Sequence, residues 1–149
     1  MTSALDHRGR PRVAVTGMGV KAPAGLSVEA LWDGLLAGVS AAAPVTLFDP
    51  VDHPVGFACE VKDFDPVAYV GPKEVRRTDR AALLGIAAAA DAIEAATADA
   101  PLGADPLRCG VVAGSGIGGV RTLEDEGIGY AEKGPSTVGW VGVATMMAS

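Results

Sequence analysis

Three stretches of the chain repeat hydrophobic residues at helical spacing. The first follows Ser27, a favourable N-cap residue, and ends at Gly38. The second runs from residue 78 or 79 to about residue 97. Alanines cover its other faces, so we expect it to be well buried, with neighbours packed closely on more than one side. The third spans residues 119–133, although two internal glycines weaken this prediction.

Runs of β-branched and apolar residues between these helices predict buried strands. Residues 12–16 and 111–113 each pass directly into glycines, and residues 55–61 are a plausible further strand. Cys59 and Cys109 lie in such runs, so we expect reduced core residues rather than a disulfide. The prolines between residues 39 and 55 indicate a loop. Strands that alternate with helices favour an α/β layered fold with a partly parallel sheet.

A glycine-rich stretch, Gly114 to Gly119, follows one of these strands and is the strongest local indication of function. Its glycines indicate close approach by backbone, by a ligand or by a neighbouring subunit. This stretch and Gly17-Met18-Gly19 both imitate a dinucleotide fingerprint, but neither has an acidic residue at the end of a second strand. A phosphate-binding P-loop is excluded, because Val120 and Arg121 stand where lysine and serine or threonine are needed. A structural turn is the simpler interpretation, and a stand-alone nucleotide-binding domain is an alternative.

No complete catalytic set appears in the local motifs. Ser115 as a nucleophile would need a base, and the only histidines are His7, near the N-terminus, and His53, in a proline-rich loop. His53 has no second ligand nearby, so no metal site is predicted. Apolar surroundings would leave the Cys109 thiol unreactive.

Charge and composition narrow the classes of partner. The net charge of −6 argues against general affinity for nucleic acid or anionic membranes. With 49% hydrophobic and 20% charged residues, the chain either has faces that a partner covers or is simply rich in alanine. No signal peptide and no apolar run of membrane-spanning length is visible, so a cytoplasmic protein is expected.

The two ends of the chain differ in character. Residues 1–11 are polar and basic and predict a flexible leader, and residues 12–149 predict one domain. Residues 138–149 contain no charge and stop without a cap, a turn or a polar tail. This apolar ending is expected of a domain whose remainder lies elsewhere.

Five motifs resemble, in order and spacing, the N-terminal half of a β-ketoacyl-[acyl carrier protein] synthase. The motifs are Val13-Ala14-Val15-Thr16-Gly17-Met18-Gly19-Val20, Leu31-Trp32-Asp33-Gly34-Leu35-Leu36-Ala37-Gly38, Val61-Lys62-Asp63-Phe64-Asp65-Pro66, Asp79-Arg80 and Gly114-Ser115-Gly116-Ile117-Gly118-Gly119. The resemblance extends from about residue 11 to the end and is greatest to the elongating enzymes of fatty acid and type II polyketide synthesis. It implies the N-terminal half of a thiolase-like α/β fold, completed by a second half and dimeric.

This resemblance also implies a decarboxylative Claisen condensation of acyl and malonyl thioesters, without a cofactor or metal. In the family a cysteine takes the acyl chain from an acyl carrier protein, and two histidines assist decarboxylation and stabilise the oxyanion. None of these catalytic residues is expected in this chain, since the cysteine follows shortly after the position of Ser149 and the histidines lie in the C-terminal half. The implied partners are that C-terminal half, the carrier protein, and a second ketosynthase or a chain-length factor. A non-catalytic chain-length-factor subunit is therefore a second alternative for the chain itself.

Particular residues match functional positions of the family. Ile117 matches the residue that gates the acyl tunnel, and Gly116 and Gly118 give its side chain room to move. Gly142 and Val143 match the pocket lining, with Val143 pointing toward the dimer partner. Gly142 replaces a common aromatic residue, which predicts a reshaped and longer tunnel.

The basic residues Lys73, Arg76 and Arg77 stand close together in an otherwise acidic chain. Such a cluster can be a solvated face, or it can dock an acidic partner. The three residues match positions that bind the acidic carrier protein in the family. Ser136 and Thr137 stand where the family has two further basic residues, so the docking surface is expected to be altered.

Overall fold

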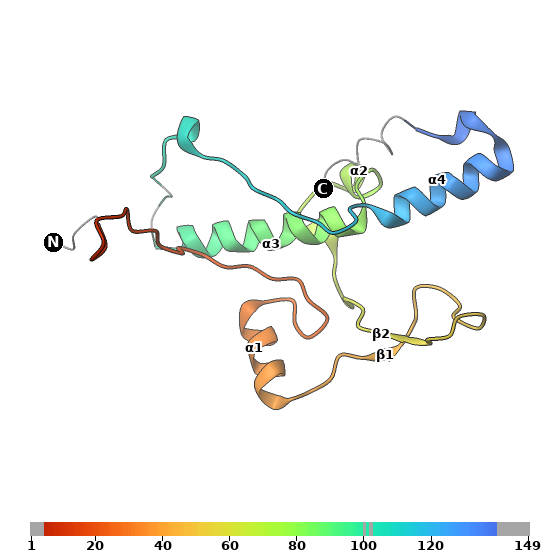
Figure 1. Cartoon of the computed structure of the whole chain (residues 1–149), viewed down its shortest axis with the longest axis horizontal. Helices are drawn as coiled ribbons and strands as arrows, with labels where there is room; N and C mark the ends of the chain where they lie inside the picture. The colour runs from red at the N-terminus through yellow and green to blue at the C-terminus, as the bar shows by residue number, and fades with distance from the viewer. Residues whose placement is uncertain (1–4, 100, 102, 140–149) are drawn as a thin grey trace.

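A computed structural model describes residues 5–99, 101 and 103–139, so Gly142 and Val143 lie outside the described residues. A long helix, α3, lies at the centre of the molecule, with drawn-out segments of chain on either side of it (Figure 1). The helices and strands are α1 (Val28–Ala37), β1 (Ala43–Pro44), β2 (Phe57–Ala58), α2 (Pro72–Val75), α3 (Arg80–Thr97) and α4 (Val120–Lys133). Three 3₁₀ turns accompany them, at Pro66–Ala68, Pro106–Arg108 and Pro135–Thr137.

The three predicted helices are confirmed, and local capping explains the starts of α1 and α3 and the ends of α1 and α4. The Ser27 hydroxyl accepts a hydrogen bond from the Ala30 amide at 3.2 Å at the start of α1, and Gly38 ends this helix with φ +65°. Asp79 caps the start of α3, and Gly134 follows the last residue of α4 with φ +83°. These signals lie within a few residues of each helix end, which is why the sequence alone reveals them.

The close packing predicted for α3 is present on one side only. The segment with Gly17 and Gly19 runs along this helix, and a Cβ on either glycine would overlap the helix backbone, at the carbonyls of Ala92 and Ala88 respectively (Figure 1). Among the described residues of α3, only Leu83 and Ala87 are buried, so the expectation of a well-buried helix is wrong for most of it. The reason is that the described segments cover only part of the helix circumference.

The predicted strands are only partly formed. The one sheet named among the described residues is an antiparallel pair, in which Ala43 lies opposite Ala58 and Pro44 opposite Phe57. The strand expected at residues 55–61 therefore shrinks to β2, and its partner β1 lies in a stretch predicted as loop. The Glu60 carboxylate supports this hairpin by accepting hydrogen bonds from the Thr46 hydroxyl (2.6 Å) and amide (3.0 Å), which lower its pKa.

Residues 12–16 and 111–113, predicted as buried strands, form no named strand in the described part of the chain. Val13 is 94% exposed and Val111 is 95% exposed. A strand exists only when its amides and carbonyls pair with a neighbouring strand, and no described segment lies beside either run in register. Cys59, which directly follows the paired strand β2, and Cys109 are both exposed, which corrects the expectation that both are core residues.

Two cationic side chains tie separate segments to α3. Lys21, whose side chain is 5% exposed, forms an ion pair with Asp91 of α3 and donates a hydrogen bond to the Leu26 carbonyl at 2.8 Å. Burial acts to lower the pKa of Lys21, but its hydrogen bonds to Asp91 and Tyr69 outweigh this effect and raise it. The ion pair thus joins the turn before α1 to the middle of α3.

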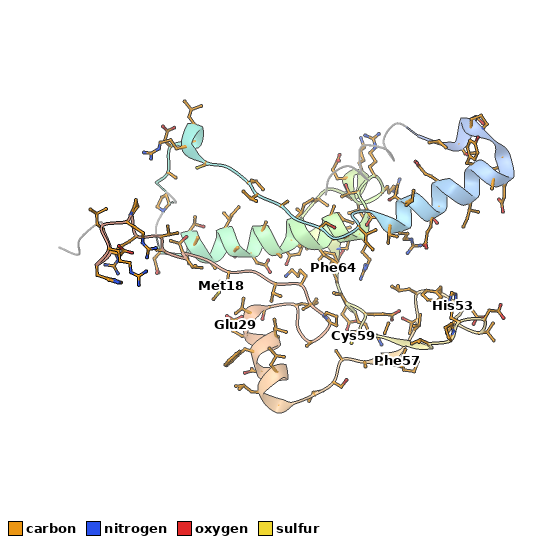
Figure 2. The ribbon with its side chains drawn as sticks, viewed as in Figure 1. Met18, Glu29, His53, Phe57, Cys59 and Phe64 are labelled. Carbon is orange, nitrogen blue, oxygen red and sulfur yellow. The ribbon has the colours of Figure 1, made fainter. Side chains whose placement is uncertain are left out.

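Arg80 ties the segment after β2 to the start of α3. Its guanidinium donates to the Val61 carbonyl at 2.7 Å and lies 5.7 Å from the ring centre of Phe64. Figure 2 shows Phe64 beside α3, above the hairpin that carries Phe57 and Cys59. The hairpin is thereby held at the end of α3 where that helix begins.

Residues 5–11 form a compact local turn. Asp6 accepts hydrogen bonds from the Arg8 and Arg10 amides, at 2.8 and 2.9 Å, and pairs with the Arg10 guanidinium at 2.9 Å. The boundary between a flexible leader and the domain at residue 12 stays a prediction.

Candidate functional site

The glycine loop, residues 114–119, is a tight turn that leads into α4. The Ser115 hydroxyl accepts a hydrogen bond from the Gly118 amide at 2.8 Å. Gly118 has φ +74°, a conformation that strongly favours glycine. Ile117, between these two residues, is 75% exposed. The sequence of the loop thus produces a turn that presents one large apolar side chain to its surroundings.

Asp79 connects this loop to the start of α3. One carboxylate oxygen accepts a hydrogen bond from the Ala81 amide at 2.9 Å, and the other accepts from the Thr122 hydroxyl at 2.9 Å and amide at 3.3 Å. A Cβ on Gly119 would lie 3.2 Å from the Asp79 side chain. The group that approaches this glycine closely is therefore a carboxylate of the same chain.

The hydrogen bonds to Asp79 also set its ionisation. Burial acts to raise the pKa of Asp79, but the hydrogen bonds from Ala81 and Thr122 outweigh it, and the pKa lies below its ordinary value. The side chain is consequently an anion at neutral pH, and each of its oxygens accepts from a different helix. The sequence already places Asp79 before a helix, but its bonds to Thr122 join residues far apart in the chain and have no local signal.

The basic segment, Lys73, Arg76 and Arg77, lies on and just after α2. All three residues are exposed, and among the described residues none of their side chains has a hydrogen-bond or ion-pair partner. Thr78 alone separates Arg77 from Asp79 in the sequence. In Figure 1, α2 lies at the end of α3 where that helix begins, and α4 begins at the same end. The structure thus brings the basic segment and the glycine loop to the same end of α3.

Other sequence candidates do not join this arrangement. His53 is exposed on the hairpin, where its ring meets Phe48 edge-on with the ring centres 5.3 Å apart (Figure 2). Cys109 is exposed, and its thiol lies 3.4 Å from the Asp105 carbonyl, within its own turn. Within the described residues, no group of three or more histidine, cysteine, aspartate or glutamate side chains could hold a metal ion.

An open groove of about 300 Å³ lies between α1 and the second half of α3, away from Ile117 and the basic segment. Met18 and Glu29, both labelled in Figure 2, contribute to its walls. Glu94 and Asp91 add negative charge, and Asp91 is paired with Lys21. None of the described residues that line the groove is a cation that would attract the phosphate group of a nucleotide.

The two glycine stretches differ from a nucleotide site in their surroundings. Gly17 and Gly19 pack against the side of α3 rather than opening a helix. Gly119 does precede α4, but the Thr122 amide at the start of that helix is bonded to the Asp79 carboxylate. A phosphate would need this amide and would be repelled by the carboxylate. The geometry thus disfavours the nucleotide-binding alternative.

Comparison with known proteins gives a consistent result over most of the chain. A family model described as β-ketoacyl synthase, N-terminal domain, matches residues 10–149. The 3-oxoacyl-[acyl-carrier-protein] synthase 2 of Synechocystis sp. is 39% identical over 128 residues, which cover 85% of this chain and 30% of the relative. The protein named granaticin polyketide β-ketoacyl synthase 1 of Streptomyces violaceoruber is 40% identical over 125 residues, covering 83% of this chain and 29% of the relative. The chain thus spans about a third of the length of these relatives.

Solved structures show the same relationship. A chain in the structure of the ishigamide ketosynthase/chain length factor superposes with a TM-score of 0.72 and 28% identity, covering 90% of this chain and 33% of that one. A second match is to one chain in the structure of a type II polyketide acyl-carrier protein in complex with its ketosynthase bound to the hexaketide, with a TM-score of 0.71 and 25% identity. It covers 91% of this chain and 36% of the other. The predicted thiolase-like fold is confirmed for this part of the protein.

Proposed function

The chain belongs to the β-ketoacyl synthase family, as its N-terminal domain, and from this premise we propose that it forms part of an enzyme that condenses acyl and malonyl thioesters. The observation that carries this proposal is the family match over residues 10–149, supported by relatives near 40% identity. The reaction is a decarboxylative Claisen condensation in fatty acid or polyketide biosynthesis. The cytoplasm is its proposed location. Among the described helices, none is long and apolar enough to cross a membrane.

In the proposed reaction, a cysteine thiolate takes the acyl group from a carrier-protein thioester. Loss of CO₂ from the malonyl thioester then leaves a carbanion equivalent, which attacks the acyl-enzyme carbonyl and displaces the thiolate. Two histidines assist decarboxylation and stabilise the oxyanion. We place the cysteine and both histidines in the C-terminal part of the enzyme rather than in this chain. No metal or organic cofactor is needed for these steps.

The acyl chain is proposed to pass Ile117. The turn formed by Ser115 and Gly118 presents this side chain at an exposed position, and a Cβ placed on the neighbouring Gly116 would have no atom within 4 Å. Gly142 and Val143 are proposed to line the deeper pocket, with Val143 directed toward the dimer partner.

A Gly142→Phe substitution refills the space of the family's aromatic residue and is expected to shorten the acyl chains of the products, measured by mass spectrometry. Products of unchanged length would contradict the proposed longer tunnel.

An acidic acyl carrier protein is the proposed partner of the basic segment. Exposed, unpaired cations attract an acidic protein from a distance and position it without a large desolvation cost. The further partners proposed are the C-terminal part of the ketosynthase and a second subunit, either an identical ketosynthase or a chain-length factor. The complexes seen among the structural relatives, a ketosynthase/chain length factor and a ketosynthase with its carrier protein, support these kinds of partner.

A chain-length factor is the second candidate for the chain itself. The match to a chain in a structure that contains both a ketosynthase and a chain length factor supports this second candidate. The two subunits share the fold but differ in whether the nucleophilic cysteine is present. Reaction with an acyl-carrier thioester therefore distinguishes them, since only a ketosynthase becomes covalently acylated.

One reconstitution experiment tests the function. The chain is produced together with the C-terminal part of its enzyme, and the complex is incubated with acyl and malonyl carrier thioesters. A condensing enzyme is expected to release CO₂, to form a β-ketoacyl thioester, and to gain the mass of one acyl group on a cysteine. A chain-length factor is expected to show neither acylation nor condensation. It would instead bind a second ketosynthase tightly and change the length of the products of that ketosynthase, and this result would support the chain-length-factor role.

A further inference from the structure

Asp79 is the one described carboxylate that caps the starts of two long helices. Its first oxygen bonds the Ala81 amide of α3, and its second oxygen bonds both the amide and the hydroxyl of Thr122 in α4. A carboxylate has enough lone pairs for all three donors, whereas a neutral amide side chain has a single acceptor oxygen. The arrangement is therefore specific for aspartate.

The start of α4 depends on this distant residue. Gly119 is the N-cap residue of α4 and has no side chain to offer, so no cap forms within the helix itself. Unbonded amides at a helix start are costly, and a side-chain cap that accepts from one of them stabilises the helix. Here Asp79 supplies the cap from a neighbouring helix, and its side chain lies within 3.2 Å of the place where a Cβ on Gly119 would be. Both the bonds and the contact fix where the glycine loop ends.

We propose that Asp79 is a positioning residue that holds the glycine loop, residues 114–119, at the start of α3 and thereby sets the orientation of Ile117. Inside the loop the Gly118 amide bonds the Ser115 hydroxyl. Asp79 lies against the last loop residue, Gly119, and bonds Thr122 three positions later, so it attaches the end of the loop to the start of α3. Because the basic segment ends just before Asp79, the same residue links the proposed carrier-docking surface to the proposed gate. The link between the docking surface and the gate rests on the proposed function, whereas the attachment of the loop to Asp79 does not.

The substitution Asp79→Asn isolates the attachment. Asparagine is as good an N-cap as aspartate, so the cap of α3 is retained, but its single oxygen cannot also accept from Thr122. Thr122→Val removes the hydroxyl donor from the other side at nearly constant volume. Asp105→Asn is the matched control, because Asp105 uses one oxygen to cap the Pro106–Arg108 turn, at 3.0 Å from the Leu107 amide. That turn lies at the opposite end of α3 from α4 (Figure 1).

The first measurement is hydrogen–deuterium exchange in the full chain, which requires no assumption about activity. Asp79→Asn and Thr122→Val are expected to accelerate exchange of the amides from Gly118 to Leu123 by about fivefold or more, and to leave α1 unchanged. The Asp105→Asn control is expected to leave residues 118–123 as in the wild type. Unchanged exchange in this region for Asp79→Asn would overturn the proposed attachment, whatever the protein's function.

The second measurement is selectivity in the reconstituted enzyme. The ratio of kcat/KM for a long and a short acyl-carrier thioester is expected to change by about threefold or more in Asp79→Asn and Thr122→Val. General loss of folded protein would lower both values equally and leave the ratio unchanged. A wild-type ratio in an active Asp79→Asn enzyme would overturn the role in gating. An inactive wild-type complex would instead contradict the proposed function, and the exchange experiment would still decide the attachment.

Discussion

At the scale of single residues, Gly17 shows how closely the segment before α1 packs against α3. A methyl group on this residue would overlap the Ala92 carbonyl of α3. Gly17→Ala is therefore expected to destabilise the protein by about 1–3 kcal/mol, because the segment must move away from the helix. Urea denaturation of the two proteins measures this difference. Gly56→Ala is the control, since no atom lies within 4 Å of its added Cβ, and equal losses for both variants would contradict the packing argument.

Charge reversal at Arg76 and Arg77 tests the proposed docking surface. These side chains are exposed and have no described ion-pair partner, so substitution by glutamate breaks no internal contact. Acyl transfer from the carrier protein is expected to slow by roughly tenfold at low salt, with a smaller effect at high salt because ions screen the attraction. Stopped-flow or quenched-flow transfer assays measure the rate.

Two controls make this docking test specific. A carrier-free acyl thioester is expected to react at the wild-type rate with the Arg76→Glu/Arg77→Glu enzyme. Arg108→Glu, at an exposed position in the Pro106–Arg108 turn, is expected to leave the carrier-dependent rate unchanged. If Arg108→Glu slowed acyl transfer from the carrier protein equally, the effect would be due to net charge rather than to the basic segment.

At the scale of elements, α4 is a complete helix whose sequence contains two internal glycines. Gly127 has open space around its potential Cβ and no positive φ, so alanine fits there. Gly127→Ala is expected to stabilise the helix by about 0.5–1 kcal/mol by reducing the freedom of the unfolded chain. Thermal unfolding followed by circular dichroism measures it. Gly134→Ala is expected to have the opposite effect, because φ is +83° there, and stabilisation by both variants would contradict this interpretation.

The helices were predictable because their signals are local. Ser27, Asp79 and Gly134 each act on amides or carbonyls within a few residues, and the apolar spacing repeats within each helix. The strands were not, because a strand requires a partner that is distant in sequence. Strand β2 shows this, because its partner, β1, contains Pro44 and lies in a stretch with the composition of a loop.

At the scale of the whole molecule, the apolar segments at residues 12–16 and 111–113 depart from an ordinary folded surface, because their valines are 82–102% exposed. We expect the C-terminal part of the enzyme to cover them, because the chain spans about a third of its relatives and these valines are almost fully exposed. Addition of that part should slow amide exchange in both segments. The exposed loop at residues 49–54 serves as the control, and unchanged exchange at 12–16 and 111–113 would contradict this arrangement.

The candidate site was predictable in its parts and not in its connections. The family resemblance singled out Ile117 within the glycine-rich motif, and the clustering of three basic residues in an acidic chain singled out the basic segment. The roles of both stay predictions. Their common attachment through Asp79 depends on bonds to Thr122, 43 positions later in the chain. No spacing rule connects two residues so far apart, and the path of the chain around α3 is what brings them together.

The contact between Gly17, Gly19 and the alanines of α3 also constrains how this protein can evolve. The glycines leave room for the carbonyls of Ala88 and Ala92, and Gly17 also lies against the Ala96 side chain. Because the carbonyl oxygens nearest to the two glycines belong to the main chain of α3, a larger residue at position 17 or 19 would separate the two segments, and no smaller side chain on the helix would compensate. In an alignment of homologous sequences, glycine is therefore expected at positions 17 and 19 whatever residues stand opposite them in α3, rather than size changes at 17 that are matched by changes at 96.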